Sequence, residues 1–165
     1  MNAQVNSSSF SYSMAEPGDL AGIRALLSQY ELPHEDVDPH LLNMIVAKKD
    51  AHLVGTAAVE LHGTAALLRS VCVAQRCRSL GVATHLCDLV SAHAQSLGAT
   101  HLYLLTTTAA RFFEARGFSH CARDSVPADI RATTEFLGLC PASAACLVLQ
   151  MSSTPRRDRR VEELK

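Results

Sequence analysis

Hydrophobic residues recur along this chain with two spacings, and the spacings predict its secondary structure. Between residues 20 and 27, apolar side chains return every three or four positions, as they do on the buried face of a helix. Pro17-Gly18-Asp19 precedes this stretch and is typical of a helix start. A longer stripe with the same spacing runs from residue 82 to residue 97 and stops at Gly98. The pattern therefore predicts two amphipathic helices.

Shorter apolar runs, rich in β-branched residues, predict strands. The turn His62-Gly63-Thr64 separates two of these runs, so we expect an antiparallel hairpin there. The expected strands cover residues 10–14, 52–61, 65–73, 101–106, 118 onward and 144–151.

Three shorter helices are expected between these strands. Asp38-Pro39 places an acidic N-cap and a proline at the first helical position, before an apolar stretch that reaches Ile45. Residues 109–116 form a second helix that Gly117 ends, and residues 127–137 form a third. A hairpin followed by alternating strands and helices predicts an α/β fold, in which helices flank a mixed sheet.

The size and composition of the chain suit one domain. It has 165 residues, of which 48% are hydrophobic, enough for a full core. We expect the domain to cover residues 11–151, with flexible tails at 1–10 and 152–165, where core-forming residues are scarce. The basic run at 156–160 is interpreted as solvated disorder or a frayed helix and not as a nucleic-acid arm.

Charge and cysteine usage narrow the classes of function. With a formal net charge of -1, the chain lacks the field that collects nucleic acid or an anionic membrane surface. No apolar run approaches the ~20 residues that span a bilayer, and the polar N-terminus lacks the features of a secretory signal. The six cysteines are scattered without CxxC pairs, as reduced thiols are. These features predict a cytoplasmic protein with a small-molecule partner, and they leave a homodimer open.

One junction, residues 67–85, has the features of an anion site. An apolar strand runs into a short polar loop there, and the loop opens a helix at Gly81. A helix start leaves backbone N–H groups unpaired and carries the positive end of the helix dipole, so it can hold a pyrophosphate. Arg78 and Thr84 can add a charge-assisted bond and a hydroxyl donor. The chain contains neither GxxxxGK[ST] nor GxGxxG after a strand, which excludes a P-loop and a dinucleotide-binding motif.

Three sequence blocks give this junction a context. Residues 68–74, with Arg78-Ser79-Leu80-Gly81-Val82-Ala83, resemble the strand and the Arg/Gln-x-x-Gly-x-Gly/Ala loop of the GNAT superfamily of acetyl-CoA-dependent N-acetyltransferases. Residues 110–118, ARFFEARGF, are similar to the short helix of that superfamily that closes on Gly-Phe. More weakly, residues 126–136 with 139–141 resemble acetyltransferases encoded beside arsenic-resistance genes. The resemblance implies a single-domain GNAT-like mixed sheet with splayed central strands.

The resemblance also implies acetyl-CoA as co-substrate and indicates the residues that hold it. Main-chain groups of Val71 and Val73 are expected to pair with the pantetheine arm, and the amides of residues 78–84 to hold the pyrophosphate. Phe113 stands where many members have the tyrosine that protonates the leaving thiolate, and Thr106 replaces an asparagine that touches the cofactor. The corresponding thiol has a pKa of about 8.5, so its thiolate is a fair leaving group without such an acid. The expected cofactor-binding residues are Val71, Cys72, Val73, Arg78, Ser79, Leu80, Gly81, Val82, Ala83, Thr84, Thr106 and Phe113.

Four residues are candidates for the acceptor side of the site. By the resemblance, Glu60 is the catalytic carboxylate that deprotonates the amine through water; the alternative is a solvent-facing strand residue. Arg69 lies in an apolar strand and needs a partner, either an acidic group of the acceptor or Glu60 across the hairpin, and we favour Glu60. Ser70 and Arg131 complete the expected substrate-binding set. Arg131 and Glu135 also suit a surface ion pair one helical turn apart, which we favour.

Two further groups of residues receive structural interpretations. Residues 33–40 have the side chains of a metal site, but their prolines and Asp38 are explained by a loop and a helix cap, so we predict no metal. Cys72, Cys87 and Cys146 lie in periodic apolar segments and are interpreted as core residues. Cys77 lies in the phosphate loop and is expected to be exposed.

The predicted function is transfer of an acetyl group from acetyl-CoA to the amine of a small, amino-acid-like molecule. The third sequence block suggests a link to arsenic resistance, with the glutamate-like toxins arsinothricin and phosphinothricin as candidate acceptors. Two alternatives stay open. Because Phe113 cannot act as an acid, the chain can be an acyl-CoA-binding sensor without catalysis, or its six cysteines can make it a thiol-based metalloid-binding protein.

Overall fold

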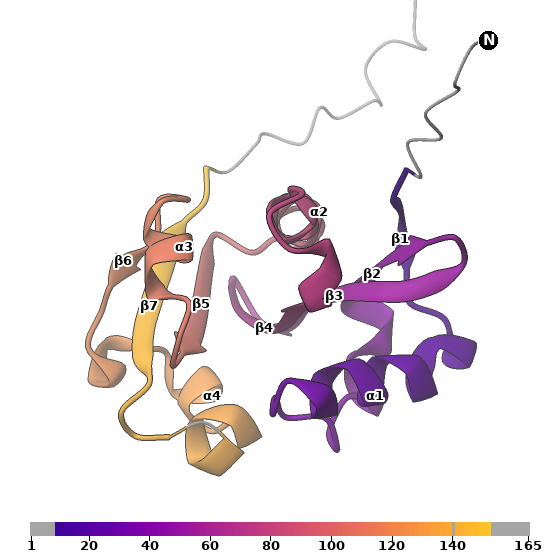
Figure 1. The fold of residues 1–165 in the computed structure, drawn as a ribbon. Coiled ribbons are helices and arrows are strands. Elements are labelled where there is room, and N and C mark those ends of the chain that lie inside the picture. Colours follow the sequence, from indigo (N-terminus) through magenta and orange to yellow (C-terminus); the bar gives the residue numbers. More distant parts are fainter. Residues whose placement is uncertain (1–8, 140, 153–165) are drawn as a thin grey trace, which may run out of the picture.

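Seven strands form one mixed sheet in the computed structural model, which describes residues 9–139 and 141–152. The order across the sheet is β1-β2-β3-β4-β5-β7-β6 (Figure 1). All neighbouring strands are antiparallel except β4 and β5, which are parallel. The strands are β1 (Ser11–Met14), β2 (Met44–Lys49), β3 (His52–His62), β4 (Ala65–Val73), β5 (His101–Thr106), β6 (Ser119–His120) and β7 (Ala145–Gln150). The predicted α/β class and hairpin are confirmed.

Helices cover both faces of this sheet. Figure 1 shows α2 on one face, above the middle of the sheet, and α1 and α4 on the opposite face. The helices are η1 (Pro17–Asp19), α1 (Leu20–Gln29), η2 (Asp38–Asn43), η3 (Gln75–Cys77), α2 (Val82–Ser96), α3 (Ala110–Glu114), η4 (Arg123–Ser125), α4 (Ala128–Arg131) and η5 (Glu135–Leu139). None of the helices in the described ranges is long and apolar enough to cross a bilayer.

Gly55 on β3 explains how closely α2 packs against the sheet. A Cβ atom at this position would lie 2.8 Å from Leu86 Cδ1 and 3.3 Å from both Val82 Cγ1 and Ala47 Cβ. Val82 and Leu86 form the first buried turns of α2, so the helix start is fixed against the strand by direct contact. This contact holds the start of α2 at the place where β4 ends.

The segment before the hairpin differs from the prediction. The expected helix is a short 3-10 helix, η2, whose N-cap is Val37 and not Asp38. Asp38 instead forms an ion pair with Arg24. The strand β2 follows directly and was not predicted, because residues 44–47 are all buried and give no alternation between two faces.

The helix expected over residues 127–137 is also interrupted. It ends at Arg131, and a single π-helical turn, η5, begins at Glu135. Thr133 is buried between them and donates a hydrogen bond from Oγ1 to the carbonyl oxygen of Ile130, 2.6 Å away. Arg131 is exposed, whereas Glu135 is only 6% exposed, so the interpretation of the two as a surface pair is wrong.

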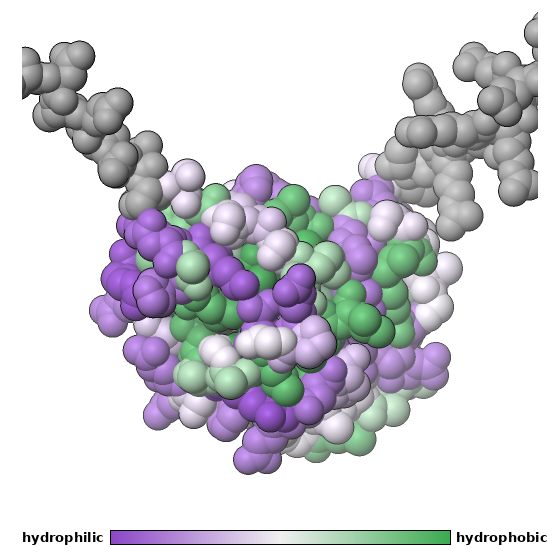
Figure 2. Space-filling view, turned by 90° about the vertical axis from the view of Figure 1, so that its right-hand side faces the viewer, coloured by the Kyte–Doolittle hydropathy of each residue, from purple (hydrophilic) through white to green (hydrophobic). Residues whose placement is uncertain are grey.

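On the face shown in Figure 2, the described residues form no single apolar area that would identify a dimer interface. Figure 2 turns the right-hand side of Figure 1 towards the viewer, and hydrophilic and hydrophobic residues are interspersed over it. The large exposed apolar side chains of the described residues come from separate elements and loops: Met14, Leu42, Leu80, Leu97 and Leu137. The homodimer therefore stays a prediction.

Candidate active site

The two central strands part within the sheet. β4 and β5 are paired only from Ala65 and His101 to Leu67 and Tyr103. Beyond Leu67, the edge of β4 that faced β5 has no strand beside it, and a cavity of about 910 Å³ opens between residues 68–73 and residues 104–106. Backbone groups on such an edge can pair with an extended ligand. This geometry matches the splayed strands that were predicted.

A bulge lies at the point where the strands part. Thr56 is opposite Cys72 and Ala58 is opposite Arg69, so β4 carries one residue more than β3 between these pairs. Ser70 within the bulge has a φ of +55°. Thr56 is fully buried and donates a hydrogen bond from Oγ1 to the carbonyl oxygen of Ser70 at 2.7 Å. Because a bulge bends its strand, this one helps β4 to leave β5.

The start of α2 opens into the same cavity. Gly81 is the N-cap, with a φ of +83°, and no heavy atom lies within 4 Å of the place where its Cβ would be. The first turn contains no acidic residue, so its unpaired amides and the helix dipole present a positive end. Thr84 Oγ1 accepts a hydrogen bond from Arg116, which leaves the hydroxyl hydrogen available to a ligand. These residues fit a pyrophosphate.

Arg78 is held beside this helix start. Its Nε donates to the carbonyl oxygen of Val73 at 3.0 Å, and its guanidinium lies 4.6 Å from the centre of the Tyr30 ring. The Tyr30 hydroxyl in turn accepts a hydrogen bond from the amide of Gln75 at 2.7 Å. Cys77, within the same loop, is 1% exposed, so the expectation that it is exposed is wrong.

Most of the predicted cofactor-binding residues line this one cavity. The exception is Leu80, whose side chain is 58% exposed and lies outside the lining. Of the acceptor-side candidates, Arg69 and Ser70 line the cavity, whereas Glu60 and Arg131 do not. The predicted residues in the lining are Val71, Cys72, Val73, Arg78, Ser79, Gly81, Val82, Ala83, Thr84, Thr106 and Phe113.

The two residues that depart from the superfamily pattern lie on the β5 side of the cavity. Thr106 Oγ1 accepts a hydrogen bond from the amide of Ala109 at 3.0 Å and so shapes the turn before α3. Phe113 is buried, with its ring edge-on to Phe112 and Phe118. A phenylalanine in an aromatic cluster packs the wall and supplies no proton.

Arg69 is the centre of a charged cluster at the other end of the cavity. Its side chain is fully buried; Nη2 lies 2.7 Å from Asp36 Oδ1, and Nη1 lies 3.4 Å from Glu60 Oε2. The predicted pairing of Arg69 with Glu60 is confirmed, and Asp36 is a second, closer partner. Two carboxylates and one guanidinium leave the cluster with one negative charge, which suits a cationic ammonium group.

Two histidines complete the cluster. His40 Nε2 lies 3.1 Å from Arg69 Nη1, and His62 Nε2 lies 3.1 Å from Glu60 Oε1. Burial, followed by the charge of Arg69, lowers the pKa of His40, so its imidazole is neutral and Nε2 can accept from the guanidinium. The carboxylate of Glu60 is therefore held from two sides.

Asp36 links this cluster to the segment between α4 and η5. Its Oδ2 accepts a hydrogen bond from Thr134 Oγ1 at 3.1 Å, in the segment between α4 and η5. Burial acts to raise the pKa of Asp36, but the hydrogen bond and charge of Arg69, with Thr134, outweigh it and lower the pKa. Asp36 is thus an ionised link between the α1–η2 loop and the C-terminal elements.

Sequence reasoning missed Asp36, His40 and His62 as members of the site. Residues 33–40 were interpreted as a loop and cap, yet this loop supplies the main counterion of Arg69. The usable signal was Arg69 itself, because a charge in an apolar strand requires a partner. No group of three or more His, Cys, Asp or Glu residues within the described part of the chain could hold a metal ion.

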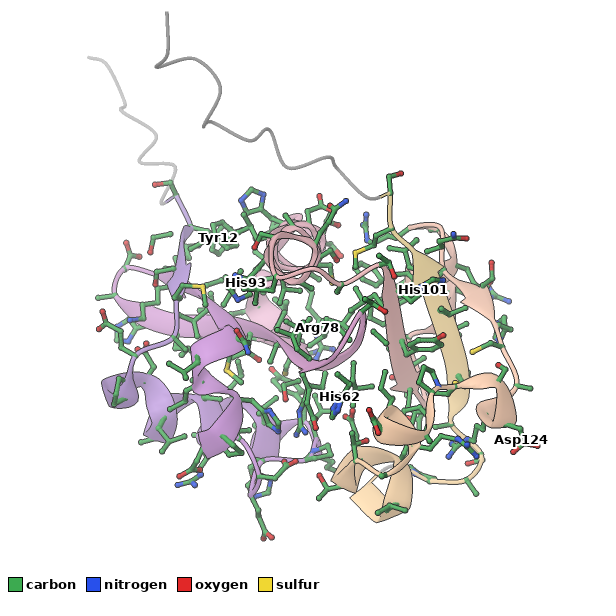
Figure 3. The ribbon with its side chains drawn as sticks, turned by 180° about the vertical axis from the view of Figure 1, so that it is seen from behind. Tyr12, His62, Arg78, His93, His101 and Asp124 are labelled. Atoms are coloured by element: carbon green, nitrogen blue, oxygen red, sulfur yellow. The ribbon has the colours of Figure 1, made fainter. Side chains whose placement is uncertain are left out.

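The two ends of the site lie along the middle of the molecule. Figure 3 shows the fold from behind, with Arg78 below α2 and His62 further towards α4. The path from one to the other follows β4, from the positive helix start to the negatively charged cluster.

Comparisons with known proteins agree with this geometry. Residues 10–118, more than half of the chain, match the Acetyltransferase (GNAT) family. The chain belongs to this family, which confirms the predicted superfamily.

Solved structures share the fold. N-acetylglutamate synthase from Neisseria gonorrhoeae, complexed with coenzyme A and N-acetyl-glutamate, has a TM-score of 0.78 and 22% identity; the match covers 87% of this chain and 35% of that one. The chain thus spans about a third of the synthase. Rv2747 from Mycobacterium tuberculosis, in complex with CoA, has a TM-score of 0.75 and 19% identity, covering 86% and 99%. An acetyltransferase of the GNAT family from Staphylococcus aureus has a TM-score of 0.73 and 15% identity, covering 87% and 100%. Coenzyme A is therefore bound by relatives of this fold.

Proposed function

We propose that this protein is an acetyl-CoA-dependent N-acetyltransferase that acts on the primary amine of a small, amino-acid-like molecule. The parting of β4 and β5 carries the proposal, because one cavity runs from an open, positive helix start to Arg69, and Arg69 holds the carboxylates of Asp36 and Glu60 behind the cavity wall. A nucleotide thioester can enter at the first end, and an ammonium at the second.

Acetyl-CoA supplies an activated acetyl thioester when it is bound. The amides of residues 81–84 and the Thr84 hydroxyl would hold its pyrophosphate, with Arg78 beside them. The free edge of β4 near Val71 and Val73 would pair with the pantetheine arm. The aromatic wall of Phe112 and Phe113 excludes water from that side of the cavity.

Glu60 is the candidate base. A primary amine reaches the site as an ammonium, so a proton must leave before the nitrogen can attack the thioester carbon. Glu60 would accept that proton through water, while a backbone amide near Val73 stabilises the oxyanion. The C–N bond forms, the C–S bond breaks and the thiolate leaves. Phe113 donates no proton, so the thiolate must leave unaided or take its proton from water.

The acceptor class follows from the charge of the cluster. One surplus negative charge favours an ammonium, and the contacts of Arg69 with Asp36, Glu60 and His40 assign it first to holding Glu60. Glutamate and the glutamate-like toxins arsinothricin and phosphinothricin are candidate acceptors. Their support is the sequence block at residues 126–136 with 139–141, together with a fold shared with a synthase solved with N-acetyl-glutamate. Arg69 and Arg131 stay predicted ligands for the acidic groups of such acceptors.

The test is thiol release from acetyl-CoA with a panel of amino acids, polyamines and amino-acid-like toxins. At least one acceptor should raise the rate clearly above background. Gly81→Asp should abolish both CoA binding and turnover, because it places a carboxylate at the pyrophosphate site. Gly98→Asp is the matched control, since Gly98 also has a positive φ and open space around its Cβ position.

The same experiments separate the alternatives. Normal affinity of Gly81→Asp for CoA would overturn the cofactor site. Binding of acetyl-CoA without turnover across the whole panel would favour the sensor. Binding of trivalent arsenic in a titration of the apoprotein would favour the metalloid-binding protein.

A further inference from the structure

Two cysteine sulfur atoms lie in contact, away from the cavity. Cys121, which follows β6, and Cys146, in β7, have their Sγ atoms 3.4 Å apart. The amide of Cys121 donates to the carbonyl oxygen of Cys146 at 3.0 Å, so the backbone fixes the two residues opposite each other. Cys121 is partly exposed and Cys146 is buried. Of the five cysteines that the structure describes, these two alone have sulfur atoms in hydrogen-bonding contact.

The pair stands at the base of an excursion of the chain. Residues 122–145 connect the two cysteines: the chain leaves the sheet after Cys121, forms η4, α4 and η5, and returns to the sheet at Ala145, the first residue of β7. This excursion carries Thr134, which binds Asp36. It also carries Arg123, which donates to the carbonyl oxygen of Pro141 at 2.8 Å and so ties the outgoing chain to the returning chain. A covalent bond between the cysteines would close the excursion at its base.

We propose that Cys121 and Cys146 form a reversible disulfide when the protein meets a hydroperoxide, and that this bond locks the excursion of residues 122–145 onto the sheet. A disulfide has an S–S distance of about 2.05 Å, so the two sulfur atoms need to approach each other by little more than an ångström. Residues directly opposite in antiparallel strands have Cβ atoms about 5 Å apart, somewhat further than a relaxed disulfide prefers. Such a bond is more easily reduced than a relaxed one, which makes the site reversible.

The chemistry runs through two balanced steps. The more exposed sulfur, Cys121 as thiolate, attacks the outer oxygen of the hydroperoxide; an S–O bond forms, the O–O bond breaks and an alcohol leaves after protonation. The Cys146 sulfur then attacks the sulfenic acid, so that the S–S bond forms and the S–O bond breaks. Burial raises the pKa of Cys146, so this thiol keeps its proton until it leaves with the hydroxyl as water. Two thiols are oxidised and one peroxide is reduced to an alcohol and water.

The other described thiols lack this arrangement. Burial raises the pKa of Cys72 to about 11 and that of Cys87 to about 12, and these two thiols, like that of Cys77, lie in the core. Cys140, the sixth cysteine, lies outside the described residues and is the one competitor that the experiment must separate.

The test is made on the whole protein treated with tert-butyl hydroperoxide. We expect a mass loss of about 2 Da and a fall from six to four titratable thiols. Peptide mapping should find the bridge between Cys121 and Cys146, and dithiothreitol should restore six thiols. Hydrogen exchange in residues 122–145 should slow in the oxidised form. None of these measurements depends on acetyl-CoA, so they stand apart from the proposed function.

Variants make the assignment specific. Cys121→Ser and Cys146→Ser should each abolish the mass loss, whereas Cys140→Ser should keep it. A bridge mapped to Cys140, retention of the mass loss in either pair variant, or stepwise oxygen addition to Cys121 without a bridge in the wild type would overturn the proposal. Because the mapping uses the wild-type protein, a variant that fails to fold does not block the test.

Discussion

Glu60 shows at the scale of one residue how a strand position becomes a candidate base. Its carboxylate is 20% exposed, contacts Arg69 through one oxygen and contacts His62 through the other. A carboxylate in this setting is oriented without being sealed from water. In the proposed mechanism, Glu60 would take the proton of the bound ammonium through water, with His62 as the neighbouring group.

We predict that Glu60→Gln lowers kcat by about 100-fold or more, the usual scale for a lost general base. Glutamine keeps the shape and can still accept from Arg69, so the KM for acetyl-CoA should change little. The dependence of kcat/KM on pH should lose its acidic limb. Glu114→Gln, in which an exposed carboxylate paired with His120 is removed from α3, is the control and should behave as wild type. An unchanged pH profile in Glu60→Gln would rule Glu60 out as the base.

The same cluster shows which part of the site the sequence could predict. The residues around Gly81 are consecutive, so a local pattern with the right flanks was enough to find them. The partners of Arg69 lie 9, 29 and 33 positions away along the chain, and only the folded structure identifies them. The need of Arg69 for a counterion could be predicted, but the choice of Asp36 depends on the path of a loop.

At the scale of a secondary-structure element, the bulge of β4 is the feature that helps this strand to part from β5. It lies where β4 parts from β5, and the buried hydroxyl of Thr56 satisfies the carbonyl oxygen of Ser70 within it. Without this bond, the partly buried carbonyl oxygen of Ser70 would lose its partner, and a regular strand without the bulge would become more favourable. If β4 were regular, the alternation of its side chains between the two faces of the sheet would shift by one residue. The side chain of Arg69 would then change its position relative to the cavity.

Thr56→Val is expected to lower the free energy of unfolding by about 1 kcal/mol, the net contribution of a typical hydrogen bond, because the carbonyl oxygen of Ser70 is only partly buried. It should also raise the KM for acetyl-CoA, because the edge of β4 that faces the cavity would move. Urea unfolding and steady-state kinetics measure the two effects. Thr100→Val removes the bond from Thr100 Oγ1 to the carbonyl oxygen of Thr64 outside the cavity and should change stability alone. Equal kinetic effects in the two variants would contradict a special role of the bulge.

At the same scale, the strands and helices with clear periodicity were predicted and those without it were not. α2 and the β3–β4 hairpin follow their patterns and occur where expected. β2 was missed because both of its faces are covered, so four successive residues are buried and a period of two disappears. The break between α4 and η5 was missed because the buried Thr133 is a tertiary feature.

At the scale of the whole molecule, the opening between β4 and β5 divides the sheet into two parts, β1 to β4 and β5 to β7. Polar contacts join these two parts across the opening. Beyond the short β4–β5 pairing, Asp36 and Thr134 connect the α1–η2 loop with the elements after β6. The charged cluster therefore has a structural role as well as a chemical one, and its protonation should affect the stability of the fold.

His40 makes this coupling measurable through pH. Its pKa lies below the ordinary value of 6.5 because of burial and the charge of Arg69, although Glu60 and Asp36 oppose the shift and His62 adds to it. Below that ordinary value, the unfolded chain binds a proton that the folded protein does not, so the free energy of unfolding falls as the pH falls. The slope from this one group is at most about 1.4 kcal/mol per pH unit.

We predict that urea unfolding between pH 7 and pH 5 shows this loss and that His40→Gln reduces it. Glutamine can still accept from Arg69 through its carbonyl oxygen but does not titrate. Asp36 does not affect this comparison. Its pKa is lowered in the folded protein, so its contribution to the free energy of unfolding is lost only at more acidic pH. His52→Gln, at an exposed position on β3, is the control and should keep the wild-type slope. If the free energy of unfolding of His40→Gln and of His52→Gln changed with pH as steeply as in the wild type, His40 would not be the group that makes the stability of the fold depend on pH.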